Sequence, residues 1–307
     1  MTGKTRTDPN NRWALVLAGG DGTRLQNFIR KIAGAPIPKQ YCRLLGDRSL
    51  LEATLGRVRS FAPRERTAVV LNRNHIDIGR DQIHFLPAEN ILVQPSNRDT
   101  GPGLLFALLH LARRDPHAIV AVFPSDHYVR NEAAFMDAVG RASHLLACFP
   151  EKVVVLGVHP DRPDPGFGYV MPGEPVDPAE WDDAFHVHCF QEKPAPKTAA
   201  MLIAAGGLWN SFVMVYRVAT MLQLLERLMP AEVVEMRRAV HNTPGAIANT
   251  YAALSPWNFS SRLLAQIPEH LLVLRVKDVG WSDWGTPESI RRTILTFASP
   301  PRWFAAD

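Results

Sequence analysis

The stretch LAGGDGTRL, residues 17–25, continues an apolar run that begins at Trp13, and it combines three glycines with a threonine and an arginine. Glycines allow successive backbone N–H groups to point toward the same position, which is the arrangement that binds a phosphate chain. The planar guanidinium group of Arg24 adds a permanent positive charge. The stretch completes neither GxxxxGK[ST] nor GxGxxG, which argues against a P-loop ATPase and a dinucleotide-dependent dehydrogenase. We interpret it as a loop that binds a nucleoside triphosphate.

The first half of the chain alternates apolar runs with helical patterns. Five runs are typical of buried strands: residues 13–17, 67–71, 91–93, 119–123 and 153–158. Between them, Ser49 and Glu52 match a capping box, a helix is expected from Thr100, and Asn131 is placed to cap another. This alternation predicts an α/β fold with a doubly wound, mostly parallel sheet and right-handed crossovers.

Three polar segments follow strands of this predicted sheet. They are LAGGDGTRL, QPSNRD at 94–99 and FPSDH at 123–127. Ligands of such sheets bind beyond the carboxyl ends of the strands, so we expect these segments to meet at one edge.

The second half is less regular. Residues 159–184 are rich in Pro, Gly and Asp, and the pattern predicts strands at 185–190, 212–216 and 271–276, a helical region at 221–239 and a helix at 287–298. We interpret this part as a smaller inserted lobe. The predicted domains are a disordered tail at 1–12, one domain at 13–298 with halves 13–130 and 131–298, and a C-terminal tail at 299–307, with no appended domain.

Composition limits the classes of function. The 307 residues are 46% hydrophobic and carry a net charge of +4, without a basic stripe interleaved with aromatic residues, so nucleic acid is not an expected partner. No stretch of about 18 apolar residues occurs, so a membrane is not an expected partner either. Cys42, Cys148 and Cys189 lack the spacing of a zinc site or a disulfide framework. No targeting signal is visible, and we expect a cytoplasmic protein.

Two aspartates are candidate metal ligands. Asp126 follows the strand at 119–123, at the expected ligand edge, and Asp283 stands in GWSDWG between two tryptophans. Two carboxylates from distant segments suit Mg²⁺ when phosphates and water supply the remaining oxygens. The structural alternative is that both carboxylates only cap turns or helices.

Other polar residues suit an anionic sugar ligand. Lys39 in PIPKQYC and Lys193 in FQEKP lie next to prolines that stiffen the backbone, although both could also be solvated surface lysines. Glu192 and Asn210 can hydrogen-bond sugar hydroxyls. His186 and His188 alternate on a strand and are interpreted as half-exposed strand residues rather than metal ligands.

Seven motifs occur in a familiar order: LAGGDGTRL, PKQYC at 38–42, FPSDH, FGYV at 167–170, FQEKP at 190–194, LWNSF at 208–212 and GWSDWG at 280–285. Together they resemble the sugar-1-phosphate nucleotidylyltransferases, and most closely the bacterial mannose-1-phosphate guanylyltransferases. The resemblance extends over residues 13 to about 298. It implies a Rossmann-like nucleotide half, a sugar-binding half and a Mg²⁺-dependent reaction.

The resemblance also implies a role for each matching residue. The phosphates would bind Gly19, Gly20, Gly22 and Thr23, with Arg24 and Lys39 as a charge clamp. The metal would bind Asp126 and Asp283, and the sugar phosphate would bind Lys193. The sugar would contact Gly168, Glu192 and Asn210. The base is expected near Leu17, Ala18 and Gly19, and beside Gln94, Asn97 and Thr100.

The implied reaction condenses a sugar 1-phosphate with a nucleoside triphosphate and releases pyrophosphate, with mannose 1-phosphate and GTP as the expected pair. It needs positioning and charge neutralisation rather than a nucleophilic side chain. The segments QPSNRDTGPG at 94–103 and SPWNFSSRLL at 255–264 differ from the family's usual runs. Uridylyl or thymidylyl transfer to glucose 1-phosphate therefore stays an alternative function, as does a non-catalytic sensor that binds a nucleotide sugar. For the assembly, a homo-oligomer is a possible state.

Overall fold

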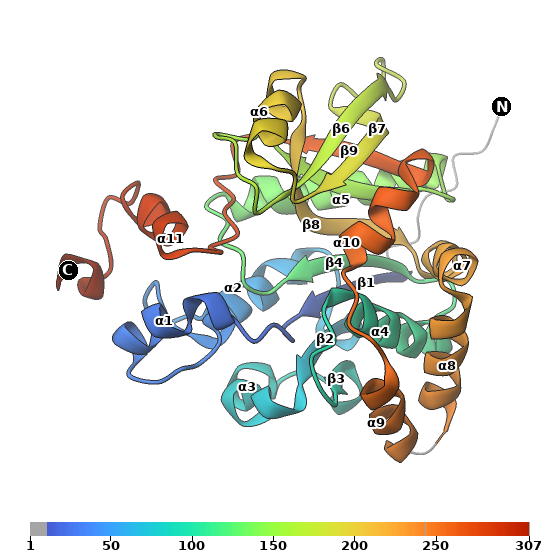
Figure 1. Ribbon diagram of the computed structural model, residues 1–307, viewed down its shortest axis with the longest axis horizontal. Coiled ribbons are helices and arrows are strands. Elements are labelled where there is room, and N and C mark those ends of the chain that lie inside the picture. Colours follow the sequence, from blue (N-terminus) through green and yellow to red (C-terminus); the bar gives the residue numbers. More distant parts are fainter. Residues whose placement is uncertain (1–10, 243, 307) are drawn as a thin grey trace.

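The computed structural model describes residues 11–242 and 244–306 (Figure 1). Most of the predicted tail at 1–12 therefore lies outside the described residues. Its last residue, Arg12, is not part of a tail but begins strand β1. No helix in the described ranges is long and apolar enough to cross a membrane.

Within the described residues, nine strands form one sheet in the order β3-β2-β1-β4-β8-β5-β9-β7-β6. Pairings show that β8 and β7 run opposite to the other strands, so the sheet is mixed but mostly of one direction. Their bounds are β1 Arg12–Leu17, β2 Thr67–Asn72, β3 Ile91–Gln94, β4 Ile119–Pro124, β5 Val153–Val158, β6 Gly168–Pro175, β7 Ala184–Glu192, β8 Leu208–Arg217 and β9 Leu271–Val276.

All eight predicted strands are present, and the sequence reasoning missed β6. This strand lies in the Pro- and Gly-rich stretch 159–184, and its pairing with β7 shifts register at Pro172. A proline cannot donate to a strand ladder, so its presence argued against a strand there. The structure accommodates it at a bulge beside the edge of the sheet.

The helices are α1 Gln26–Ala33, α2 Leu50–Arg57, α3 Ile76–Ile83, α4 Thr100–Arg114, α5 Glu132–Cys148, α6 Pro196–Ala204, α7 Val218–Leu228, α8 Pro230–His241, α9 Pro244–Ala253, α10 Phe259–Arg262 and α11 Pro287–Ile294. The capping box of Ser49 and Glu52 and the cap at Asn131 are confirmed. The helical region predicted at 221–239 is two helices, because Pro230 starts a new one. The helix expected to reach residue 298 ends at Ile294.

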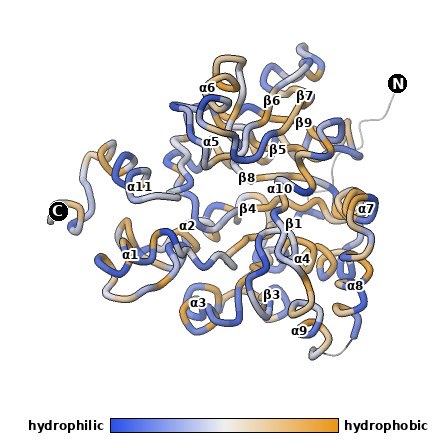
Figure 2. The backbone as a smooth tube through the Cα atoms, viewed as in Figure 1, coloured by the Kyte–Doolittle hydropathy of each residue, from blue (hydrophilic) through white to orange (hydrophobic). Residues whose placement is uncertain are grey.

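Helices cover both faces of the sheet. Successive side chains of each strand point to opposite faces, so they pack into two separate hydrophobic cores. Trp13 and Leu15 face the side of α4, α7 and α8, whereas Ala14 and Val16 face the side of α2 and α5. Figure 2 shows the resulting hydrophobic segments along the strands and more hydrophilic ones in outer elements such as α3. The two-sided burial explains why these strands are continuous apolar runs in the sequence.

A third, smaller core joins the two ends of the chain. Ile29 of α1 packs with Trp284 and Ile290, and Trp303 of the 3-10 helix Arg302–Ala306 packs against it. The indole N–H of Trp303 donates to the carbonyl of Leu44 at 2.9 Å. The stretch predicted as a C-terminal tail thus includes residues packed on the first helix.

Candidate active site

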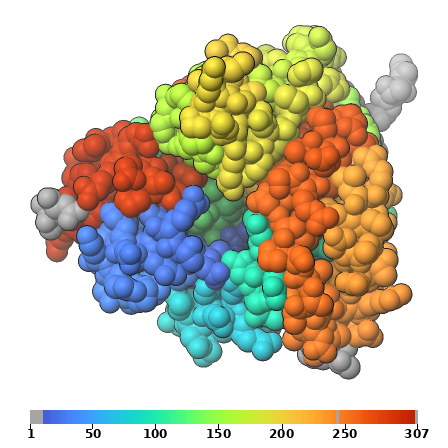
Figure 3. All heavy atoms as spheres, in the orientation of Figure 1, coloured from blue at the N-terminus to red at the C-terminus, as the bar shows by residue number. Residues whose placement is uncertain are grey.

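A cavity of about 650 Å³ opens where the carboxyl ends of β1, β3 and β4 face the second half of the chain. Figure 3 shows the hollow between the blue and teal segments below and the yellow segment above. Most of the predicted site residues line this one cavity: Leu17, Gly19, Gly20, Arg24, Gln94, Asn97, Thr100, Asp126, Gly168, Glu192, Lys193, Asn210 and Asp283. The predicted residues that are not among its lining residues are Ala18, Gly22, Thr23 and Lys39.

The glycine loop uses its carbonyl groups, but not the amides of Gly19 and Gly20, in hydrogen bonds with other described residues. The carbonyls of Gly19 and Gly20 accept hydrogen bonds from Asn72 Nδ2 at 2.6 Å and Gln40 Nε2 at 2.7 Å. The N–H groups of Gly19 and Gly20 donate to no other described residue. Gly22 has φ +61°, a conformation that favours glycine. The loop therefore presents unpaired donors to the cavity, as a phosphate site requires.

Asp21, which sequence reasoning left without a role, ties this loop to the ends of β2 and β3. Its carboxylate accepts from Asn72 Nδ2 at 3.1 Å and from Asn97 Nδ2 at 2.8 Å. His75 Nε2 lies 3.4 Å from the same carboxylate. The only sequence signal for Asp21 was its place among the glycines, because its partners come from other segments.

Lys39 lies beneath the two predicted metal ligands instead of facing the cavity. Its side chain is 7% exposed, and its Nζ lies 3.3 Å from Asp126 Oδ2. The same ammonium donates to the carbonyls of Asp283 and Trp284, the latter at 2.8 Å. Lys39 thus bridges the two aspartate segments, and its predicted role as a charge clamp on the phosphates stays a prediction.

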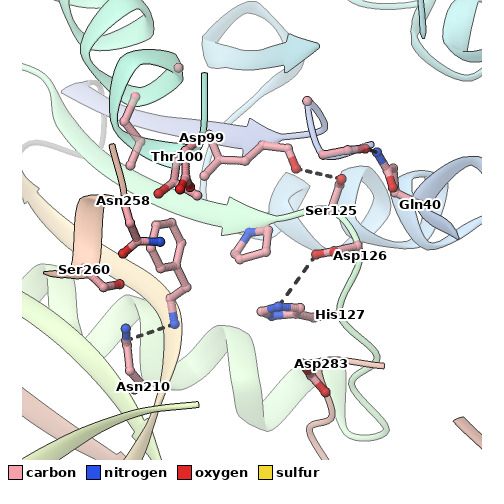
Figure 4. A pocket seen from close by; sticks show the side chains of 18 of the residues that line it. Gln40, Asp99, Thr100, Ser125, Asp126, His127, Asn210, Asn258, Ser260 and Asp283 are labelled. Atoms are coloured by element: carbon pink, nitrogen blue, oxygen red, sulfur yellow. Dashed lines mark hydrogen bonds and ion pairs between the residues drawn. The ribbon is translucent and has the colours of Figure 1, made fainter. Parts of the chain in front are cut away.

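Asp126, His127 and Asp283 lie together on one side of the cavity (Figure 4). Burial is the largest single influence on the pKa of Asp126 and would raise it, but the charge and hydrogen bond of Lys39, together with His127 and a backbone hydrogen bond, outweigh burial and hold that pKa below its usual value. Burial lowers the pKa of His127, so the ring is neutral near pH 7. His127 Nδ1 accepts from Trp281 Nε1 at 3.2 Å, which leaves the Nε2–H facing Asp126 Oδ1 at 3.7 Å.

This donor set fits a divalent cation that is also bound by substrate. The described residues hold no group of three His, Cys, Asp or Glu side chains placed to ligate a metal. Asp126 and Asp283 place two carboxylates on the same side of the cavity, and Lys39 favours the ionised form of Asp126. Mg²⁺ is commonly held by one or two carboxylates together with phosphates and water.

The residues predicted to contact the sugar meet at the ends of β6, β7 and β8. A Cβ at Gly168 would lie 2.5 Å from Glu192 Oε2 and 3.0 Å from the Phe190 ring, so a larger residue would displace the Glu192 carboxylate. Lys193 Nζ lies 3.4 Å from Glu192 Oε1. Asn210 Oδ1 accepts from the Phe212 N–H at 3.0 Å, and no described residue accepts from its Nδ2. A carboxylate, an ammonium and a free amide are thus grouped here.

Backbone strain also concentrates around the cavity. Asp99, Lys193 and Phe212 have φ values of +68°, +47° and +58°, and all three line the cavity. Such conformations are unfavourable for residues other than glycine and persist where the surroundings enforce them. Asp99 and Phe212 were missed by the sequence reasoning, because local propensity does not reveal an enforced positive φ.

The unusual segment 255–264 supplies a further wall of the cavity. Asn258 and Ser260 line it, opposite Asp126 (Figure 4). The segment is docked on the first turn of α4: Gly101 N–H donates to Trp257 O at 3.0 Å, and Phe259 N–H donates to Thr100 Oγ1 at 2.9 Å. The sequence indicated that segment 255–264 is unusual, because it differs from the family's usual run. Only the structure shows that the segment lies at the site.

The substitution Gly101→Ala is expected to displace segment 255–264 from the first turn of α4. A Cβ at Gly101 would overlap the Trp257 ring, so the ring and segment 255–264 must shift. We expect a loss of about 1–3 kcal/mol in unfolding free energy and a higher KM. Chemical unfolding and steady-state kinetics measure both. Gly140→Ala on α5, where no atom lies within 4 Å, is the matched control, and equal behaviour of the two variants would refute the docking role.

Glu192→Gln is expected to change the pH dependence of stability. Burial raises the pKa of Glu192, although Lys193 opposes this. The folded protein therefore holds this proton more tightly than the unfolded chain, so stability falls as pH rises between the two pKa values. At pH 7 the variant should be more stable than the wild type. This difference should disappear below pH 4.5, the ordinary pKa of a glutamate, where Glu192 is protonated in both the folded and the unfolded state. Thermal unfolding across pH, with exposed Glu174→Gln as the control, tests this; a gain that does not depend on pH contradicts it.

Comparison with known proteins identifies the family. Residues 13–299 match the sequence model of a family described as nucleotidyl transferase. The chain belongs to the nucleotidyl transferase family. Mannose-1-phosphate guanylyltransferase ManC of Salmonella typhimurium is 30% identical over 289 residues, which are 91% of this chain and 58% of that protein. Mannose-1-phosphate guanylyltransferase of Escherichia coli K12 is 34% identical over 224 residues, which are 71% of this chain and 45% of that protein.

This nucleotidyl transferase spans about half the length of the curated relatives that it matches. Among solved structures, one described as mannose-1-phosphate geranyltransferase from Thermus thermophilus superposes with a TM-score of 0.81 at 28% identity, over 95% of this chain and 80% of that one. These matches confirm the family resemblance that the motifs carried and the fold class predicted from the alternation of strands and helices.

Proposed function

We propose that this nucleotidyl transferase condenses mannose 1-phosphate with GTP to give GDP-mannose and pyrophosphate. The observation that carries the proposal is that one cavity joins the unpaired amides of the glycine loop, two carboxylates and the group of Glu192, Lys193 and Asn210. Each group suits one part of the reaction: the triphosphate, the metal and the sugar phosphate. The likeness to two mannose-1-phosphate guanylyltransferases supports this choice of substrates.

The chemistry follows from positioning. A phosphate oxygen of the sugar 1-phosphate attacks the α-phosphorus in line, the new O–P bond forms, and the bond to the β-phosphate oxygen breaks as pyrophosphate leaves. Lys193 would hold the attacking phosphate, and Arg24 with the loop amides would bind the triphosphate. Asp126 and Asp283 would hold Mg²⁺, which when bound offsets charge on the phosphate oxygens. No proton transfer is required, because the attacking phosphate is already anionic.

The base would lie beside Gln94. This side chain is 3% exposed, its Nε2 donates to Asn72 Oδ1 at 2.7 Å, and its Oε1 accepts from Tyr251 at 3.3 Å. The network fixes the orientation of the amide, so Oε1 is available as an acceptor for the N1–H and 2-amino donors of guanine. Oε1 has a second lone pair beside the one that accepts from Tyr251, and a base without a donor there would leave it unused, which disfavours that base.

A pyrophosphate-release screen tests the proposal. It crosses GTP, ATP, UTP and dTTP with the 1-phosphates of mannose, glucose and N-acetylglucosamine, at fixed Mg²⁺. GTP with mannose 1-phosphate is expected to react fastest. Faster uridylyl or thymidylyl transfer to glucose 1-phosphate would overturn the choice of base and sugar but leave the reaction type. Tight binding of GDP-mannose without release from any pair would instead favour the non-catalytic sensor.

A further inference from the structure

A second, smaller cavity of about 150 Å³ lies behind the wall of the candidate active site. Phe167 and Trp281 line both cavities, so they separate the two by one layer of aromatic side chains. The rest of the small cavity comes from β8, α11 and the loops around residues 130, 161 and 281. None of the motifs that identified the family accounts for its arginines.

The small cavity has an excess of positive charge. Arg130, Arg162 and Arg292 line it, together with the carboxylate of Asp161. Arg162 is neutralised by Asp161 at 2.6 Å and Asp164 at 2.9 Å. Within the described residues, neither Arg130 nor Arg292 has a carboxylate partner, and the Arg130 side chain donates only to the hydroxyl of Thr296. Two guanidinium groups therefore keep donors for a ligand.

A buried indole adds a neutral donor. Trp209 is 4% exposed and lines the cavity, and its Nε1–H finds no acceptor among the described residues. A buried N–H without a partner is unfavourable by about 1–3 kcal/mol. The indoles of Trp257 and Trp284 also have no acceptor among the described residues, but neither of them lines this cavity. A ligand oxygen in the cavity would satisfy the Trp209 N–H.

We propose that this cavity binds a small oxyanion of the phosphate class. Its 150 Å³ is about five times the share of one water molecule in the liquid, which suits a tetrahedral phosphate. It is well below the roughly 300–1,000 Å³ of sites for larger ligands, which excludes a whole nucleotide. Guanidinium forks are the donors best matched to phosphate oxygens.

The anion would sit on the two segments that carry the candidate metal ligands. Arg130 N–H donates to Val279 O at 3.0 Å, and its side chain packs on Gly280, where φ is +59° and a Cβ would lie 2.7 Å from Arg130 Cβ. Tyr128 and Ser282 exchange backbone hydrogen bonds at 2.9 and 3.0 Å. Asp126 lies two residues before Tyr128, and Asp283 directly follows Ser282. An anion bound in the small cavity would therefore also stabilise the pairing of the two loops that carry these aspartates.

Calorimetric titration with inorganic phosphate tests the site, with GTP and Mg²⁺ present at saturation so that the large cavity is filled. The wild-type protein should bind phosphate under these conditions, and Arg292→Glu should weaken binding at least tenfold. Arg292→Lys, which keeps the charge, should stay within a few-fold of wild type. Arg291→Glu is the matched control, since this neighbour on α11 does not line the cavity. Circular dichroism checks that each variant folds.

Two results would overturn the inference: equal phosphate binding by wild type and Arg292→Glu, or loss of all phosphate binding when GTP is present, which would place the phosphate at the glycine loop. A parallel titration with glycerol 3-phosphate, a phosphate monoester without a carboxylate, distinguishes the source of the anion. Tighter binding of this monoester assigns the site to a phosphorylated metabolite, and tighter inorganic phosphate assigns it to the free ion. These binding readouts do not depend on the proposed catalytic activity.

Discussion

Replacing Asp126 or Asp283 by asparagine is expected to lower kcat by on the order of a hundredfold or more, while the fold survives. Each change keeps the size of the side chain but removes a charge that faces the metal and the phosphates. Both residues line the cavity, and Lys39 keeps Asp126 ionised. Turnover measured over a Mg²⁺ titration should show that more metal is needed for half-maximal activity.

Asp278→Asn is the matched control for this pair. Asp278 lies five residues before Asp283 on the same loop but is not among the residues that line the cavity, and its φ of +56° is a conformation that asparagine tolerates. Its turnover should equal that of the wild type. Full activity of Asp283→Asn at limiting Mg²⁺ would reject Asp283 as a ligand, and unequal losses would show that only one aspartate binds the metal directly.

Lys39→Met is expected to lower both activity and stability. The change leaves the carbonyls of Asp283 and Trp284 without their donor, at about 1–3 kcal/mol, and removes the cation nearest to Asp126. The Asp126 pKa should then rise, because burial continues to act without the opposing charge. The acid limb of the pH–activity profile is therefore expected to move to higher pH.

The same variant has a defined effect on stability against pH. The lowered pKa of Asp126 contributes stability that is present above its unfolded pKa and is lost as pH falls through the folded pKa. Lys39→Met should thus destabilise the protein more at pH 7 than at pH 3, as measured by chemical unfolding. Exposed Lys31→Met is the control. If only the KM for GTP changed, with stability and the acid limb intact, Lys39 would act on the triphosphate directly.

Much of the fold follows from local patterns in the sequence. The buried strands were predictable because β1 to β5 are covered on both faces and so read as unbroken apolar runs. The caps at Ser49 and Asn131 were predictable because they depend on residues three positions away. The glycine loop was recognisable for a similar reason, since its backbone geometry depends on its own glycines.

The arrangement of the candidate site was decided by the tertiary structure. The role of Lys39 depends on Asp283, 244 residues away, and the wall formed by Asn258 depends on the docking of Trp257 on Gly101. Such contacts depend on which strands are neighbours, and β8 enters the sheet between β4 and β5. Periodicity and capping report only on residues a few positions apart. The sequence by itself therefore determined eight of the nine described strands, several helices and many of the residues that line the cavity, whereas packing between distant segments decided what each side chain contacts.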